Sequence, residues 1–94
     1  MYRITTHELI EEDLRSLSKK DQDRILGAIE RKLSSHPDVF GKPLGKVLKG
    51  FYRLRVGPYR IVYKIEKQKI MVFVIHVGFR RDEEVYREAI RRLS

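Results

Sequence analysis

Apolar residues recur at three- and four-residue steps in two adjoining stretches near the N-terminus, after a short candidate strand at residues 2–5. This period predicts two amphipathic helices. Thr6 is the expected N-cap of the first helix, and the segment Ser18 to Asp21 matches a capping box for the second, which ends before Pro37. Because the connection is short, we expect an antiparallel helical hairpin. The apolar positions are Leu9, Ile10, Leu14 and Leu17, then Ile25, Leu26, Ile29 and Leu33.

Side chains in the second half of the chain alternate between two faces with the period of two that is typical of strands. Residues 51–56 and 59–65 predict two strands joined by a turn at Gly57-Pro58. Residues 70–77 are apolar apart from His76, which predicts a central strand covered on both faces. On the first two strands, one face carries Tyr52, Leu54, Val56, Tyr59, Ile61, Tyr63 and Ile65, and the other carries Phe51, Arg53, Arg55, Arg60, Val62 and Lys64.

A last helix begins at Asp82, its expected N-cap, and its apolar positions again recur at three- and four-residue steps. Residues 39–50 show no sustained period, so we expect a loop there. The order β-α-α-β-β-β-α predicts an α+β fold, with residues 1–94 as a single domain and the helices covering one face of a small, largely antiparallel sheet. Four basic side chains then meet on the other face: Arg53, Arg55, Arg60 and Lys64.

The net charge of +8, from 21 Lys and Arg against 13 Asp and Glu, is concentrated in the middle of the chain. Residues 42–69 hold nine basic residues and one acid, whereas the rest of the chain is neutral. A local excess of this kind favours a site for a polyanion, although a solvated basic face gives the same composition. Four acids crowd the first helix, where we expect a solvated outer face: Glu8, Glu11, Glu12 and Asp13.

Several classes of site are excluded or disfavoured by composition. The chain has no cysteine, its three histidines are scattered, and neither a Walker A nor a GxGxxG motif is present, so we expect no metal and no cofactor. His76 is expected to be a buried or half-buried ring with satisfied hydrogen bonds rather than a proton-transfer group. No stretch approaches the ~20 apolar residues of a membrane span, so we expect a cytoplasmic protein with no membrane partner.

A cluster of guanidinium groups with tyrosines nearby has a definite use on RNA, which carries its own nucleophile. When a site aligns the 2′-hydroxyl with the neighbouring phosphate and arginines stabilise the pentavalent transition state, cleavage needs no metal. Tyr52 and Tyr63 are expected to pack in the core. Arg80 and Tyr86 flank the point where the central strand leads into the last helix, so we expect them to reach the edge of the arginine face.

Two sequence blocks, Gly50 to Tyr63 and Val77 to Tyr86, resemble the RelE branch of the RelE/ParE toxins, and the likeness covers nearly the whole chain. The resemblance implies a ribosome-dependent endoribonuclease that cuts mRNA in the decoding site, with a cognate RelB-like antitoxin. It also implies that Arg60 stabilises the scissile phosphate, Arg80 lies near the leaving group and Tyr86 stacks on or orients the substrate nucleotide. For the antitoxin we expect an acidic, partly helical segment that neutralises the arginine face or displaces the last helix.

Arg53 and Arg55 stand where the best-studied members of that family have lysines, one of which is suggested as a general base. An arginine stays protonated, so it serves well as an electrostatic clamp and poorly as a base. Proton transfer would then run through water, Tyr86 or a ribosomal group. The expected catalytic set is Arg53, Arg55, Arg60, Arg80 and Tyr86, and the expected RNA-binding set is Lys42, Lys46, Lys49, Lys64 and Arg81.

Two other functions stay open on the sequence alone. A ParE-like toxin that inhibits DNA gyrase by protein contact would share the fold, but the joint presence of Arg60, Arg80 and Tyr86 argues against it. A non-catalytic RNA-binding or ribosome-binding module would need only the basic segment.

Overall fold

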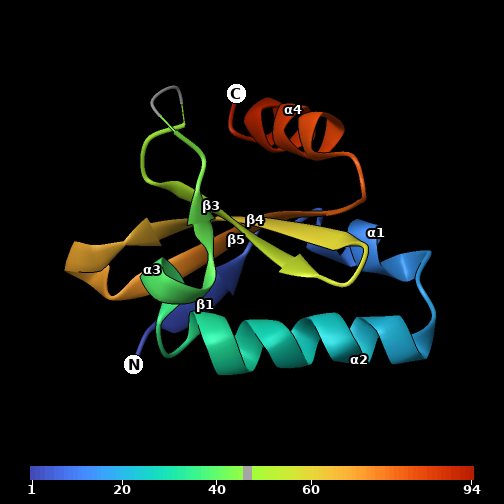
Figure 1. The fold of residues 1–94 in the computed structure, drawn as a ribbon, viewed down its shortest axis with the longest axis horizontal. Coiled ribbons are helices and arrows are strands. Elements are labelled where there is room, and N and C mark those ends of the chain that lie inside the picture. The colour runs from blue at the N-terminus through green and yellow to red at the C-terminus, as the bar shows by residue number, and fades with distance from the viewer. Residues whose placement is uncertain (46–47) are drawn as a thin grey trace.

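The computed structural model describes residues 1–45 and 48–94, which form one mixed sheet with helices on both sides (Figure 1). The strands are β1 (Arg3–Thr6), β2 (Lys42–Pro43), β3 (Phe51–Val56), β4 (Tyr59–Glu66) and β5 (Met71–Phe79). They lie in the order β1-β5-β4-β3-β2. β1 pairs with β5 in parallel and the other pairs are antiparallel, so the predicted α+β class and largely antiparallel sheet are confirmed.

The helical segments are α1 (Ile10–Arg15), α2 (Lys19–Ala28) with its continuation η1 (Ile29–Leu33), α3 (Pro37–Phe40), η2 (Lys67–Lys69) and α4 (Asp82–Arg92). None of these helices is both long and apolar enough to cross a membrane. The hairpin of the first two helices is uneven, because the short α1 packs on β5 whereas α2 runs beneath the sheet (Figure 1). The loop predicted at residues 39–50 is wrong in part, since α3 extends into it and β2 pairs with β3.

One face of the sheet packs against α1, α2 and η1 and forms the larger core. The apolar positions predicted for this face of β3 and β4 all lie in it, with Tyr52 only partly buried. Tyr63 is fully buried, stacks on Tyr52 with ring centroids 5.7 Å apart, and donates a hydrogen bond to the carbonyl oxygen of Pro37 at 2.6 Å. Burial raises the pKa of the Tyr63 hydroxyl, so the phenol stays neutral and remains a donor. The core roles expected for both tyrosines are confirmed.

The helix α4 covers the opposite face, so the expectation that all helices share one face is wrong. Val85 and Ala89 of α4 pack with Val62 and Ile75 of the sheet in a second, smaller core. Gly78 permits this close approach, because a Cβ there would stand 2.4 Å from Cγ2 of Val85. The basic side chains of this face therefore lie partly beneath a helix instead of on an open surface.

The start of α1 also differs from the prediction, because Thr6 belongs to β1 and does not cap a helix. His7 satisfies the backbone there instead: its Nδ1 accepts a hydrogen bond from the N–H of Leu9 at 3.1 Å. The cap predicted for the second helix is confirmed, since the extended Ser18 accepts the N–H of Asp21 at 3.1 Å through its hydroxyl.

The side chain of Asp13 is buried, which corrects the prediction that all four acids of the first helix are solvated. Its carboxylate accepts hydrogen bonds at 2.6 and 2.7 Å from the guanidinium of Arg92 and lies 2.9 Å from Nδ1 of His76. It also accepts the backbone N–H of Val77 at 3.0 Å, while Arg92 donates to the carbonyl oxygen of Ile75 at 2.9 Å. Both backbone groups lie on β5 beyond its pairing with β1, so the ion pair satisfies an open strand edge.

The Asp13–Arg92 pair joins α1 to the C-terminal end of α4, and the two side chains are only 7% and 5% exposed. Burial by itself raises the pKa of Asp13, but the hydrogen bonds from His76 and Arg92 outweigh it and hold the pKa below the usual 3.8. The His76 ring is half-buried with a hydrogen-bond partner, as predicted.

We predict that Asp13→Asn lowers the free energy of unfolding by about 3 to 5 kcal/mol at neutral pH, because Arg92 is left buried without its counter-charge. Urea unfolding followed by circular dichroism measures the change. The control Glu12→Gln removes an exposed carboxylate and should cost less than about 1 kcal/mol.

The loss of stability caused by Asp13→Asn should become smaller at acidic pH. Because folding lowers the pKa of Asp13, the stabilisation by the carboxylate is present above pH 3.8 and is lost as the pH falls below it. Equal stabilities of the Asp13→Asn and Glu12→Gln variants at neutral pH would contradict the buried ion pair.

Candidate active site

Three arginines meet on the sheet face that α4 partly covers, and we call them the arginine cluster: Arg53, Arg55 and Arg60. The β3–β4 hairpin places Arg55 directly opposite Arg60 and Arg53 opposite Val62. Gly57, with a φ of 57°, permits the two-residue turn that fixes this register. Like charges directly opposite one another destabilise a sheet, so the cluster requires a counter-charge.

Asp82, the first residue of α4, supplies the counter-charge. Its Oδ1 lies 2.8 Å from Nε of Arg60, and its Oδ2 lies 3.4 Å from Nη2 of Arg55 and 3.8 Å from Nη1 of Arg53. Burial raises the pKa of the Asp82 carboxyl, but the hydrogen bonds from Arg60 and Arg55 outweigh this and lower it, so Asp82 is ionised at neutral pH. The predicted capping role is wrong, because Arg81 occupies the N-cap position and the Asp82 carboxylate turns to the arginines.

Burial differs strongly within the arginine cluster. Arg55 is 59% exposed, whereas the Arg53 side chain is 8% exposed. Nε and Nη1 of Arg53 are buried and have no hydrogen-bond acceptor among the residues that the structure describes. A buried donor without an acceptor costs free energy, and a charged donor costs more. The cluster is therefore short of anionic acceptors, with three guanidinium groups against one carboxylate.

Tyr86 lies one helical turn after Asp82 and faces the same side of α4. Its hydroxyl has a raised pKa, chiefly through burial; Asp82 also raises the pKa, while Arg53 and Arg55 oppose the shift. The ring packs against the smaller core. The helix therefore brings a neutral phenol next to the arginine cluster.

Arg80 lies at the rim of the site, on the connection between β5 and α4. Its φ of 58° is uncommon for a residue with a side chain. Its backbone N–H donates to the carbonyl oxygen of Pro58 at 2.7 Å, and its guanidinium lies over the ring of Phe79, 4.9 Å from the centroid. The β3–β4 turn thus holds the unusual backbone, and the side chain is exposed beside Phe79 instead of joining the arginine cluster.

Lys64 shares the sheet face of the arginines, as predicted, but its side chain contacts other partners. It stands four residues along β4 from Arg60, roughly 13 Å away at the usual rise of a strand. Its Nζ lies 5.6 Å from the ring centroid of Phe51 and 3.7 Å from Oε1 of Glu66. Lys64 therefore belongs to the opposite end of the hairpin.

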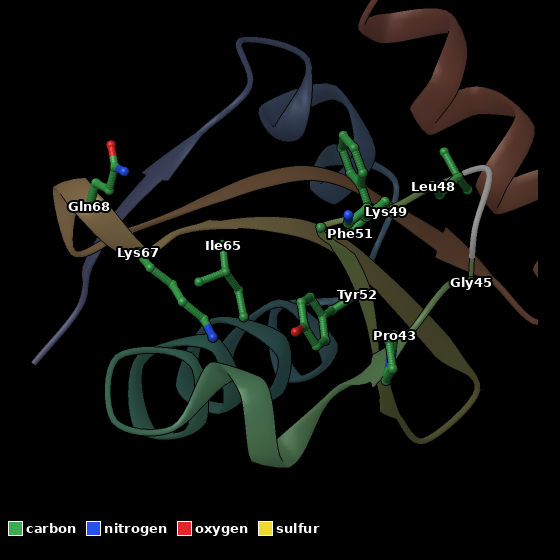
Figure 2. Close-up of a pocket in the computed structure, with 10 residues that line it drawn as sticks. Pro43, Gly45, Leu48, Lys49, Phe51, Tyr52, Ile65, Lys67 and Gln68 are labelled. Carbon is green, nitrogen blue, oxygen red and sulfur yellow. The ribbon is translucent and has the colours of Figure 1, made fainter.

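The other basic residues predicted to bind RNA are spread over the surface. Lys42 is exposed on β2, in register with Arg53, and the exposed Arg81 pairs with Glu84 at 3.3 Å. Lys49 borders an apolar groove (Figure 2), together with Pro43, Leu48, Tyr52, Ile65 and Lys67. Lys46 lies outside the described residues.

The donors of this site suit an anion. In residues 1–45 and 48–94, no three His, Asp or Glu side chains converge as metal ligands. The groups that meet at the cluster are guanidinium N–H donors and the phenol of Tyr86, with Asp82 as the counter-charge. Planar guanidinium groups match phosphate oxygens and stabilise negative charge that develops on them. The geometry is suited to hold a phosphodiester.

Comparison with known proteins points to a single family. The family model described as ParE toxin of type II toxin-antitoxin system, parDE, matches residues 4–84. The mRNA interferase toxin RelE of Escherichia coli strain K12 is 49% identical to this chain over 41 residues. That match spans 44% of this chain and 43% of the relative, which is less than half of either.

Solved structures share the fold over more of the chain. A double mutant of the toxin RelE from E. coli in the free state superposes with a TM-score of 0.77 and 29% identity, covering 99% of this chain and 98% of the other. The toxin–antitoxin complex RelBE2 of Mycobacterium tuberculosis contains a chain with a TM-score of 0.78 and 28% identity, covering 84% and 98%. The fold is that of RelE toxins.

We predict that Arg80→Gly is more stable than Arg80→Ala by about 0.5 to 1 kcal/mol, because glycine adopts a positive φ without a penalty from Cβ. Both variants lack the guanidinium, so the comparison isolates the backbone, and urea unfolding measures it. At Arg87, in the exposed middle of α4, the glycine variant should instead be less stable than the alanine variant by about 1 kcal/mol. The same order at both positions would show that the backbone of Arg80 is not strained.

Proposed function

Because this chain belongs to the family of ParE toxins of type II toxin–antitoxin systems, as a RelE-type member of the RelE/ParE superfamily, we propose that it is a ribosome-dependent mRNA endonuclease. The observation that carries the proposal is the convergence of the arginine cluster and Tyr86 beneath the start of α4. The sequence similarity to a relative named mRNA interferase supports it. The match covers under half of that relative, so the activity is a proposal for this chain.

The proposed reaction uses the RNA's own nucleophile. The 2′-hydroxyl oxygen forms a bond to the adjacent phosphorus, and the bond from phosphorus to the 5′-oxygen of the next nucleotide breaks. The 2′-hydroxyl loses its proton and the leaving 5′-oxygen gains one, which leaves a 2′,3′-cyclic phosphate and a 5′-hydroxyl. The protein must align these atoms and stabilise the negative charge on phosphorane oxygens, both of which arginines do well.

The arginines divide this work by their positions. Arg60, held on the sheet by backbone carbonyl contacts, is the proposed ligand of the scissile phosphate. Arg53 and Arg55 flank it on the neighbouring strand and add positive charge on the same side. Arg80 at the rim is the proposed contact near the leaving group, which requires its exposed guanidinium to leave the Phe79 ring when RNA binds.

The site has no side chain that is well suited to act as the general base. A raised pKa keeps Tyr86 neutral, so the phenol is suited to stack on a base or donate a hydrogen bond and not to take a proton. A lowered pKa makes Asp82 a weak base. Catalysis then rests mainly on alignment and charge, with protons moved by water or by a ribosomal group. Dependence on the ribosome follows from that missing contribution.

Two macromolecular partners belong to the proposal. The ribosome presents mRNA in the decoding site, and five further basic residues are the proposed contacts to its RNA backbone: Lys42, Lys46, Lys49, Lys64 and Arg81. An acidic RelB-like antitoxin neutralises the arginine face or displaces α4 with Tyr86. The toxin–antitoxin complex of the M. tuberculosis relative supports the second partner.

A second candidate function is inhibition of DNA gyrase, favoured by the ParE description of the family model. It would use protein contacts and would not need the arginine cluster. A non-catalytic module that binds RNA or the ribosome would need the positive charge but no alignment of reacting atoms. These functions respond differently to loss of one arginine.

We predict that Arg60→Ala lowers the rate of mRNA cleavage in a reconstituted translation reaction by roughly 100- to 1000-fold, the usual effect of losing one donor to a developing oxyanion. The matched control is Arg15→Ala, which removes an exposed arginine on α1 and should leave the rate unchanged. Circular dichroism checks that both variants fold.

Other outcomes point to the other functions. Inhibition of translation by Arg60→Ala without cleavage, at the potency of the intact protein, would indicate a binding module. Loss of gyrase supercoiling activity on addition of either variant, with mRNA intact, would indicate a ParE-like inhibitor and contradict the proposal.

A further inference from the structure

Arg60 offers only one side of its guanidinium to a ligand. Its Nη1 donates to the carbonyl oxygens of Gly57 at 3.3 Å and Tyr59 at 3.2 Å. The fork that remains is formed by Nε and Nη2, and Oδ1 of Asp82 already accepts from Nε at 2.8 Å. A phosphate that binds Arg60 through two N–H groups must take the place that the Asp82 carboxylate now holds.

Asp82 fills that place incompletely. A carboxylate has two oxygens in one plane, and here they serve Arg60 and Arg55 but reach only to 3.8 Å from Nη1 of Arg53. Nε and Nη1 of Arg53 stay without an acceptor within the described part of the chain, although the side chain is more than nine-tenths buried. A tetrahedral phosphate presents oxygens in more directions and is the better match to three converging guanidinium groups.

Asp82 can also leave without dismantling the helix. Its side chain is 33% exposed, and it is not the cap of α4. Rotation of the side chain toward solvent keeps the carboxylate at the N-terminus of the helix, where a negative charge remains favourable. The helix itself is anchored elsewhere, by Val85 in the smaller core and by Arg92 on Asp13.

We propose that Asp82 is a built-in competitor of the RNA phosphate: its carboxylate closes the arginine cluster in the free protein and must swing out before a phosphodiester can bind. The proposal rests on the proposed function only in taking RNA as the source of the phosphate. Free RNA should therefore bind weakly, because each binding event must break the ion pair between Asp82 and Arg60. Removal of this charge opens the cluster.

The test is the affinity of the full chain for a short single-stranded RNA with 2′-O-methyl groups, which carries phosphates but no nucleophile. Fluorescence anisotropy at fixed ionic strength measures it. Asp82→Asn should bind about tenfold more tightly than the intact protein, a change of the size expected for one charge at close range. Glu83→Gln, which removes an exposed carboxylate from the same helical turn, should bind within about twofold of it. Arg60→Ala should bind more weakly.

Each alternative outcome has a separate meaning. Equal affinities of Asp82→Asn and Glu83→Gln, with Arg60→Ala weakened, would overturn the competitor role and leave the proposed function standing. Unchanged affinity of Arg60→Ala would remove the arginine cluster as the phosphate site and overturn the proposed function as well.

A second measurement uses the unaltered protein and does not depend on how the variants fold. On saturation with the same RNA, the carboxyl carbon resonance of Asp82 should move toward that of an exposed aspartate, while the Nε–H resonance of Arg60 stays protected because it changes acceptor. An Asp82 resonance that is unchanged at saturation would overturn the proposal.

Discussion

The ion pairs between Asp82 and the arginine cluster are the constraint on which the site depends. Two strands joined by a two-residue turn bring Arg55 and Arg60 into direct opposition, with Arg53 close by. Such a concentration of positive charge is unfavourable in a folded sheet unless an anion lies within it. The anion comes from the first turn of α4, so in the free protein the helix that carries Tyr86 also supplies the counter-charge for β3 and β4.

The helix α4 is held at both ends by charges from distant segments. At its start, Asp82 meets the hairpin, and at its end, Arg92 meets Asp13 of α1 at the open edge of β5. Between these points Gly78 lets the helix sit directly on the sheet. The two anchors differ in kind: the Asp13 pair is buried and fully hydrogen-bonded, whereas the Asp82 pair is partly exposed and leaves Arg53 without an acceptor. The first is suited to stability and the second to exchange with a ligand.

The sequence predicted the strands and their faces well because burial enforces a period of two, and Tyr63 and Ile61 obey it. It did not predict that α4 lies on the arginine face. The signal was present in Val62 and Phe51, apolar residues on the face assigned to solvent, which require a cover. The burial of charged residues was harder to predict. Asp13 occupies a helical position that is usually solvated, and its partner Arg92 is distant in the sequence.

In the site, too, the partners of charged side chains could not be predicted from the sequence pattern. Alternation placed Arg53, Arg55 and Arg60 on one face, yet the role of Asp82 was hidden behind a capping pattern that suits an aspartate at any helix start. Which acceptor a carboxylate takes depends on the turn geometry and on neighbouring strands, and hydrophobic periodicity carries no information on either. The left-handed backbone of Arg80 could not be predicted either, because hydrophobic periodicity says nothing about the backbone angles of a turn.

The arginine cluster is proposed to promote attack by a 2′-hydroxyl of ribosome-bound mRNA on the adjacent phosphorus. The most direct measurement is the chemistry of the mRNA ends produced in a reconstituted translation reaction, compared with an mRNA that carries a single 2′-deoxynucleotide at the cut position. We expect 2′,3′-cyclic phosphate and 5′-hydroxyl ends on the unmodified mRNA, and no cut at the 2′-deoxynucleotide. Cleavage that persists at the 2′-deoxynucleotide, or arrested translation without new ends, would contradict the proposal.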